Sequence, residues 1–155
     1  MANPLVQPAS LEGVTQQRER LHAAIVELES AAAAPATAHI EGWRAGMQQA
    51  LSGLRAAFET HVAFTEAPGG LYDDILSVAP RLATAVGAVR DEHPAIAETL
   101  SQLQMVLAEQ AVEPGPWVEQ SRQQAMRALG MLVRHRQRGA DLTYTAFDEE
   151  LGGSG

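Results

Sequence analysis

Apolar residues recur at intervals of three and four positions in four long stretches of the chain, which is the pattern of helices that bury one face. In the second stretch, for example, Trp43, Met47, Leu51, Leu54 and Phe58 fall on a single helical face. Ala, Leu, Glu, Gln and Arg dominate the composition, which favours helices over strands. The breaks between the stretches are rich in Pro and Gly and lie around Pro35, at 68–70 and at 114–116.

Four long helices are therefore expected, with one short helix between the second and the third. The first begins at the capping residue Ser10 and ends near residue 34, and the second covers residues 40–66. The short helix covers 71–78, and the third long helix begins at residue 81. The fourth begins at Pro116, because proline is favoured in the first turn of a helix.

Short connections make consecutive helices antiparallel neighbours. The sequence thus predicts an all-α fold, an antiparallel up-down-up-down four-helix bundle with a short extra helix between helices two and three. The length of 155 residues suits one domain, so residues 1–155 are expected to form a single helical unit. Flexible ends are expected over residues 1–9 and over 149–155, where Gly and Ser close the chain.

Composition narrows the classes of function. The net charge is -8, all 11 basic residues are arginines, and no basic stripe is present, so neither nucleic acid nor an anionic membrane is an expected partner. The absence of cysteine excludes disulfides and thiolate metal sites. Residues 1–10 lack the features of a secretory signal, and no stretch is apolar enough to span a bilayer, so a cytoplasmic protein is expected. No protein partner is indicated.

Three of the five histidines, His61, His93 and His135, lie within the apolar stripes of the second, third and fourth helices. Residues at equal distances from the turn of an antiparallel hairpin lie side by side, and the midpoint between His93 and His135 is Pro114, in the expected turn. The corresponding midpoint for His61 and His93 falls in the segment before Pro80. The pattern therefore predicts three imidazoles at one level of the core, where they are either hydrogen-bonded core residues or ligands of a metal ion.

His22 and His39 fit this level less well. His22 lies 13 residues before Pro35, whereas His61 lies 26 residues after it, so a turn centred at Pro35 would separate them by roughly 20 Å in depth. His22 also flanks the apolar stripe of its helix. His39 stands at the start of the second helix and is interpreted as a surface or capping residue.

Three segments resemble the hemerythrin-like (HHE cation-binding) domain. His61 is followed by Glu66 and by a Gly-Gly-Leu turn at 69–71. This segment is similar to the second helix of that family. Asp91-Glu92-His93 resembles the Glu-His pair of its third helix. The segment from His135 through the Ala-Phe pair at 146–147 to the glycines at 152–153 is similar to its fourth helix. The resemblance covers nearly the whole chain.

The resemblance implies a bundle that binds non-haem iron and takes part in handling or sensing iron, oxygen or nitric oxide. The implied metal ligands in this chain are His61, His93, His135, Glu66 and His22. Hemerythrins hold two irons with histidines and two bridging carboxylates, which stand four or five residues beyond the second- and fourth-helix histidines.

This chain departs from that pattern at several positions. Thr65 stands four residues after His61, Gly139 four residues after His135, and Ala97 replaces a further third-helix histidine. Arg136 and Arg138 place positive charge beside the site, which opposes a cation. We therefore expect a reduced site for a single iron or zinc ion.

Three alternatives remain at this point. The first is a metal-free bundle that acts as a binding or interaction module, and the second is a haem bundle held by two of the histidines. In the third, Arg134, Arg136 and Arg138, which alternate around His135, hold an anion, although a solvated helix face explains them better. No Ser-His-Asp or Cys-His arrangement is found, so an enzyme is not expected.

Overall fold

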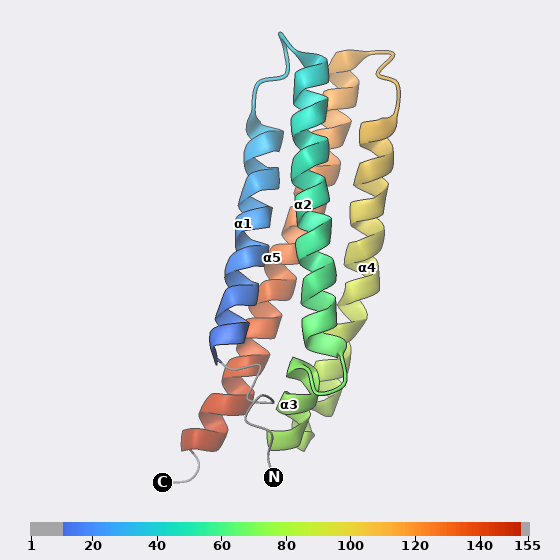
Figure 1. The fold of residues 1–155 in the computed structure, drawn as a ribbon. Helices are drawn as coiled ribbons and strands as arrows, with labels where there is room; N and C mark the ends of the chain where they lie inside the picture. Colours follow the sequence, from blue (N-terminus) through green and yellow to red (C-terminus); the bar gives the residue numbers. More distant parts are fainter. Residues whose placement is uncertain (1–10, 153–155) are drawn as a thin grey trace.

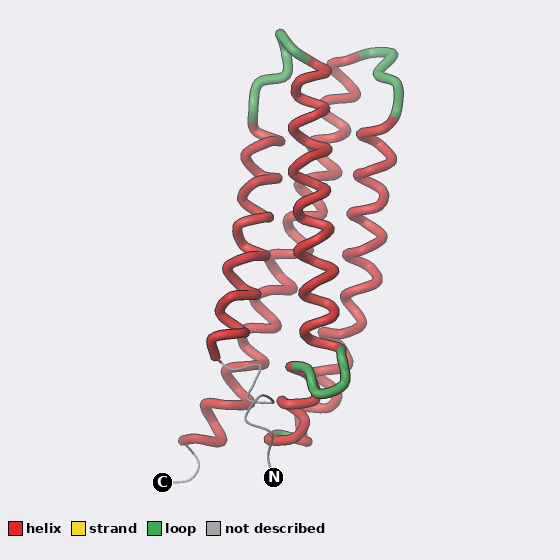
Figure 2. Tube along the Cα trace, in the orientation of Figure 1, coloured by secondary structure: helices red, strands yellow, loops and turns green. Residues whose placement is uncertain are grey.

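The computed structural model describes residues 11–152, and all regular structure in this range is helical (Figures 1 and 2). The elements in chain order are α1 (Leu11–Ala33), α2 (Ile40–Glu66), α3 (Leu71–Val78), the 3₁₀ helix η2 (Pro80–Leu82), α4 (Ala83–Ala108) and α5 (Pro114–Gly152). The predicted all-α class is confirmed, and the four long helices are consistent with a four-helix bundle.

The long helices lie side by side (Figure 1). Helix α1 packs mainly against α2 and α5, and α4 packs mainly against the same two helices. The α1–α2 and α4–α5 connections lie at one end of the molecule, whereas α3 lies at the other end, where it contacts α2, α4 and α5 (Figure 1).

Most helix bounds agree with those expected from the sequence, and the differences occur at prolines and at the carboxyl end. Residues 80–82 form a 3₁₀ turn, so α4 begins at Ala83 instead of residue 81. Helix α5 begins at Pro114 instead of Pro116, and both prolines fit the first turn, where a backbone N–H has no helical partner. The same helix continues to Gly152, past residue 149, because Glu149, Glu150 and Leu151 are good helix formers. The expected cap Ser10, the expected flexible end at 1–9 and residues 153–155 of the flexible tail expected at 149–155 lie outside the described residues.

The buried apolar residues form two clusters. The larger cluster fills the bundle from Trp43 and Trp117 at the loop end to Phe58. The smaller cluster packs α3 against α4 and α5, with Tyr72 and Ile75 among its members.

The three in-stripe histidines lie at the level where these two clusters meet. On α4, Val89 belongs to the smaller cluster and Ile96 to the larger one, with His93 between them. On α5, Leu132 and Leu142 flank His135 in the same way, in the larger and the smaller cluster respectively. A layer of imidazoles therefore divides the apolar interior.

The loop end is held together by side chains that donate hydrogen bonds to carbonyls at or near helix ends. The rings of Trp43 and Trp117 meet edge to face, with centroids 5.6 Å apart, and Trp117 Nε1 donates a hydrogen bond to Val106 O at 2.9 Å. Arg122 donates to the carbonyls of Ala32 and Ala34 at 2.8 and 2.9 Å, where the last carbonyls of α1 lack helical partners. These contacts hold α1, α2, α4 and α5 in a common register.

Within residues 11–152, none of the helices combines the length and the apolar character that crossing a bilayer requires.

Candidate metal centre

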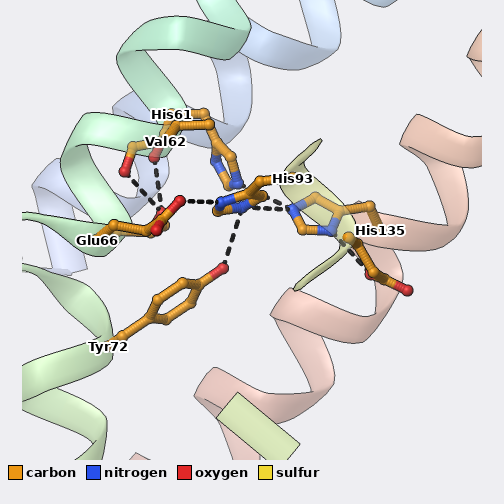
Figure 3. A network of polar contacts seen from close by, with 8 residues as sticks. His61, Val62, Glu66, Tyr72, His93 and His135 are labelled. Carbon is orange, nitrogen blue, oxygen red and sulfur yellow. Dashed lines mark hydrogen bonds and ion pairs between the residues drawn. The ribbon is translucent and has the colours of Figure 1, made fainter. Parts of the chain in front are cut away.

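His61, His93 and His135 come from three helices, α2, α4 and α5, and their rings converge (Figure 3). Nε2 of His135 lies 3.1 Å from Nε2 of His61 and 3.2 Å from Nε2 of His93. One ligand atom of each residue lies within 4.8 Å of the others. The in-stripe position predicted for these residues is confirmed: His93 and His135 are only 3% and 1% exposed, and His61 is half-buried.

Two carboxylates bind the outward-facing nitrogens of this group. Nδ1 of His93 lies 2.6 Å from Glu66 Oε2, and Nδ1 of His135 lies 2.9 Å from Glu92 Oε1. The second oxygen of Glu92 forms an ion pair with Arg138. A carboxylate at Nδ1 requires a hydrogen on that nitrogen, so Nε2 of a neutral ring carries the lone pair. Both rings are thereby oriented with their lone pairs toward the shared centre, as in the carboxylate–histidine–metal arrangements of metalloproteins.

The spacing of the inward nitrogens suits a metal ion. Nε2 of His93 lies 3.2 Å from Nε2 of His135. If both atoms carry lone pairs, the lone pairs repel each other unless a proton or a cation lies between them. Nitrogen ligands at about 2.0–2.1 Å from zinc in tetrahedral geometry lie about 3.3 Å from one another. The 3.1 and 3.2 Å separations at His135 are close to this value, whereas the three ligand atoms together are bounded only by 4.8 Å, so the match holds for the two pairs that include His135. The donor set of three imidazoles fits zinc, iron, copper or nickel better than calcium or magnesium.

The same atoms can also form hydrogen bonds without a metal, although no proton then lies between Nε2 of His93 and Nε2 of His135. Tyr72 Oη lies 3.2 Å from Nε2 of His93 and can donate to it. Burial raises the pKa of Tyr72 to about 12, so this hydroxyl keeps its hydrogen. His61 can donate from Nε2 to Nε2 of His135 if it adopts the Nε2–H tautomer. In this arrangement all three rings are neutral, and each inward lone pair of His93 and His135 has a donor.

The surroundings keep the imidazoles of His61 and His135 uncharged. Burial lowers the pKa of His61 to about 3, with further lowering by His135 and His93. Burial also lowers the pKa of His135, although Glu92 opposes this effect through its hydrogen bond. A neutral imidazole is the form that binds a metal, because a protonated ring has no lone pair to donate.

Aromatic rings enclose the group on two sides. Phe58, one helical turn before His61, stacks on the ring of His61 and meets those of His93 and His135 edge-on, at centroid distances of 6.0, 5.7 and 6.5 Å. Tyr72 stacks on His93 at 5.9 Å from the side of α3. The rings limit the positions that the imidazoles can take, which holds the inward nitrogens in place.

The turn before α3 positions Tyr72. Gly69 adopts φ 75°, a conformation that other residues rarely adopt, and its N–H donates to Asp73 Oδ2 at 2.8 Å. A Cβ at Gly70 would lie 2.6 Å from the carbonyl oxygen of Phe64, so a side chain there would push the turn apart. The two glycines thus allow α3 to fold back at the end of the bundle below α2 (Figure 1).

Two of the five predicted ligands lie outside the converging group. Glu66 is near it, but its Oε2 contacts the outward-facing Nδ1 of His93, so the structure places Glu66 behind the ring of His93 (Figure 3). His22 is exposed, and its Nδ1 lies 3.2 Å from Arg136 Nη1. His22 is therefore not brought together with the other three. His39 is exposed at the start of α2, as interpreted from the sequence.

Thr65 and Gly139 occupy the positions one turn beyond His61 and His135. Thr65 is buried, and its hydroxyl donates to the carbonyls of His61 and Val62 in its own helix at 2.9 and 3.1 Å. Gly139 has no side chain, and a Cβ added there would meet nothing within 4 Å. Neither position supplies a charged donor, so the group contains nitrogen ligands alone.

Sequence reasoning did not identify Glu92 or Tyr72 as part of the site. Glu92 is adjacent to His93 in sequence, but it reaches across to His135 on the neighbouring helix. The Glu-His pair was a signal for its importance, whereas the partner depends on how α4 and α5 are rotated against each other. Tyr72 packs on the ring of His93, and its hydroxyl also contacts Nε2 of that ring.

Comparison with protein-family models, with curated proteins and with solved structures finds no match for this chain.

Proposed function

We propose that this chain is a hemerythrin-like, up-down-up-down four-helix bundle that binds a single transition-metal ion, iron or zinc, through His61, His93 and His135. The observation that carries the proposal is the orientation of the rings. Nε2 of His93 and of His135 point at a common centre while their Nδ1 atoms are held by Glu66 and Glu92. The lone pairs of these nitrogens are thus oriented toward the cation position before a cation binds.

One ion is favoured over two by the donors present. A dinuclear centre needs bridging carboxylates, and the positions one turn beyond His61 and His135 are Thr65 and Gly139. The nearby carboxylates of Glu66 and Glu92 are engaged with Nδ1 atoms. Three imidazoles leave a tetrahedral or octahedral ion with at least one open position. An ion with an open position can bind a small molecule, which supports a role in handling or sensing iron, oxygen or nitric oxide within the cytoplasm, without catalysis.

A second candidate is a metal-free bundle that serves as a binding or interaction module. The network from Tyr72 to His93 and from His61 to His135 favours it, because this network satisfies the inward nitrogens with hydrogen bonds alone. A haem is disfavoured. Its two axial histidines must lie on opposite faces of the porphyrin, whereas the Nε2 atoms of His61, His93 and His135 converge with no space for a porphyrin between them.

Elemental analysis tests the metal proposal. The chain is purified from cells grown with added iron and zinc, and metal per chain is measured for the parent, for a His61→Ala/His135→Ala double variant and for His22→Ala. We expect about one ion per parent chain and per His22→Ala chain, and none in the double variant. His22 is the matched control, since it is a histidine that lies outside the converging group.

The metal-free module would be favoured by two results together: the purified parent protein contains no metal, and its melting temperature does not change when Zn²⁺ or Fe²⁺ is added. A ligand that binds only the folded state must raise the melting temperature. A stoichiometry of two ions per chain would instead contradict the single-ion site.

A further inference from the structure

A cavity beside the histidines contains charges that the proposed metal site does not use. It has a volume of about 270 Å³ and lies between α1, α2, α3 and α5. His61, Tyr72 and His135 contribute to its wall. Its size is near the lower end of the range for small-molecule pockets, and much of its remaining wall is apolar.

The charged residues of the cavity are all positive. Arg18 of α1 and Arg136 of α5 line it, whereas no Asp or Glu is among the described residues of its wall, although the whole chain carries a net charge of -8. Neither arginine forms an ion pair with a carboxylate in the part of the chain that the structure describes. The cavity therefore presents positive charge without a counter-ion from those residues.

Arg136 has an unused donor at this place. Its Nε is buried without a hydrogen-bond partner, while its Nη1 donates to Nδ1 of His22 at 3.2 Å. Burial lowers the pKa of Arg136, and the nearby positive charge of Arg18 lowers it further. A buried N–H that lacks an acceptor is unfavourable, and an anionic oxygen is the acceptor that a guanidinium binds most strongly.

The cavity also has room for a ligand with an apolar part. Thr65 and Gly139 line it, and the missing side chain of Gly139 leaves space next to His135. The apolar side chains of the wall come from four helices: Val14, Leu21, Phe64, Leu71, Val133 and Ala140. An inorganic anion would leave these side chains without contacts, whereas a short hydrocarbon chain would cover them.

We propose that this cavity binds a small monocarboxylate with a short apolar chain, whose carboxylate pairs with Arg136 and Arg18 and whose chain packs on the apolar wall. The inference rests on the two arginines and on the shape of the wall. It holds for the metal-free protein as well as for a metal-bound one.

Calorimetric titration of the full chain with hexanoate, after removal of metal with EDTA, tests this inference. We expect saturable binding of one hexanoate per chain. The neutral analogue hexanamide and inorganic phosphate should each bind more weakly than hexanoate, by about tenfold or more. Arg136→Gln should weaken hexanoate binding by about tenfold or more. Arg134→Gln is the matched control, since it removes the same charge from an exposed position of α5 outside the cavity wall and should leave the affinity unchanged.

A second variant tests the cavity while keeping both arginines. Gly139→Leu should fill the space and abolish hexanoate binding, and it should keep or raise the melting temperature because leucine favours a helix more than glycine does. Absence of binding to the parent chain, or equal affinity in parent and Arg136→Gln, would overturn the proposal. Phosphate that binds as tightly as hexanoate would overturn the assigned ligand class. Because the titration uses metal-free protein, its result is independent of the elemental analysis.

Discussion

Glu92 Oε1 lies 2.9 Å from Nδ1 of His135, and this contact joins α4 to α5 beside the converging nitrogens. It sets the hydrogen of His135 on the outward-facing nitrogen, and Arg138 in turn holds the second oxygen of Glu92. The orientation of the imidazole at the centre therefore depends on a carboxylate from another helix.

Glu92→Gln should weaken zinc binding by about 10–100-fold, which is the usual effect of removing a carboxylate behind a metal-binding histidine. The amide can present its NH₂ group to Nδ1 and thereby favour the wrong tautomer of His135. Competition with a chromophoric chelator measures the affinity. Asp91→Asn, which removes the same charge from the exposed neighbouring residue, serves as the control. Equal loss in both variants would show that net charge, and not the contact with His135, is responsible.

Tyr72→Phe should have different effects on the metal-free and zinc-bound proteins. Without metal, the variant removes the donor to Nε2 of His93 and should lower the free energy of unfolding by about 1–3 kcal/mol. With saturating zinc, Nε2 binds the ion and the loss should be smaller. Urea unfolding in the two conditions measures this difference. If the free energy of unfolding falls equally with and without zinc, then zinc does not replace the tyrosine hydroxyl as the partner of Nε2 of His93.

The metal-free protein should lose stability as the pH falls below about 6.5. The pKa of His61 is lowered to about 3 and that of His135 is also lowered, so the unfolded chain takes up protons between these values while the folded chain does not. Each such histidine reduces the free energy of unfolding by up to about 1.4 kcal/mol per pH unit in that window. Stability is therefore full above pH 6.5 and declines toward pH 5.

His61→Gln should flatten this decline, whereas His39→Gln, at an exposed position, should not. Urea unfolding of parent and variants from about pH 7.5 to about pH 5 gives the slopes. A parent slope that the His61 substitution leaves unchanged would contradict the burial of a neutral imidazole at this position.

Phe58→Leu should lower the free energy of unfolding by about 1–2 kcal/mol. Phe58 is 3% exposed, and its ring contacts all three imidazoles, so leucine leaves a small void above the histidines. Met105→Ala, at a side chain that is 69% exposed, should change stability by less than about 0.5 kcal/mol. Similar losses in the two variants would contradict tight packing of Phe58 in the layer.

Sequence reasoning located the elements and the three histidines because both depend on local signals. The bounds of α2 and α3 agree with the expected ranges, since Gly69 and Gly70 and then Pro80 interrupt the helical pattern. The convergence of His93 and His135 follows from their equal distance to Pro114, which requires only that α4 and α5 form a hairpin.

The contacts behind the histidines could not be predicted in the same way. The approach of Glu66 to His93, and of Glu92 to His135, depends on the rotation of neighbouring helices about their axes, which helical periodicity alone does not determine. His22 was assigned by family resemblance. The depth expected for it from a turn at Pro35 differed from that of the others, and the structure places it against Arg136.

The layer of imidazoles between the two apolar clusters has a consequence for how the molecule opens. Because the clusters meet mainly at this polar level, the α3 end can separate from its neighbours while the larger cluster stays packed. The backbone amides of the α3 end should therefore exchange with solvent faster than those around Leu54 and Leu103. An ion shared by α2, α4 and α5 would link the two clusters and slow this exchange. The imidazole layer thus determines whether the bundle behaves as one cooperative unit or as two.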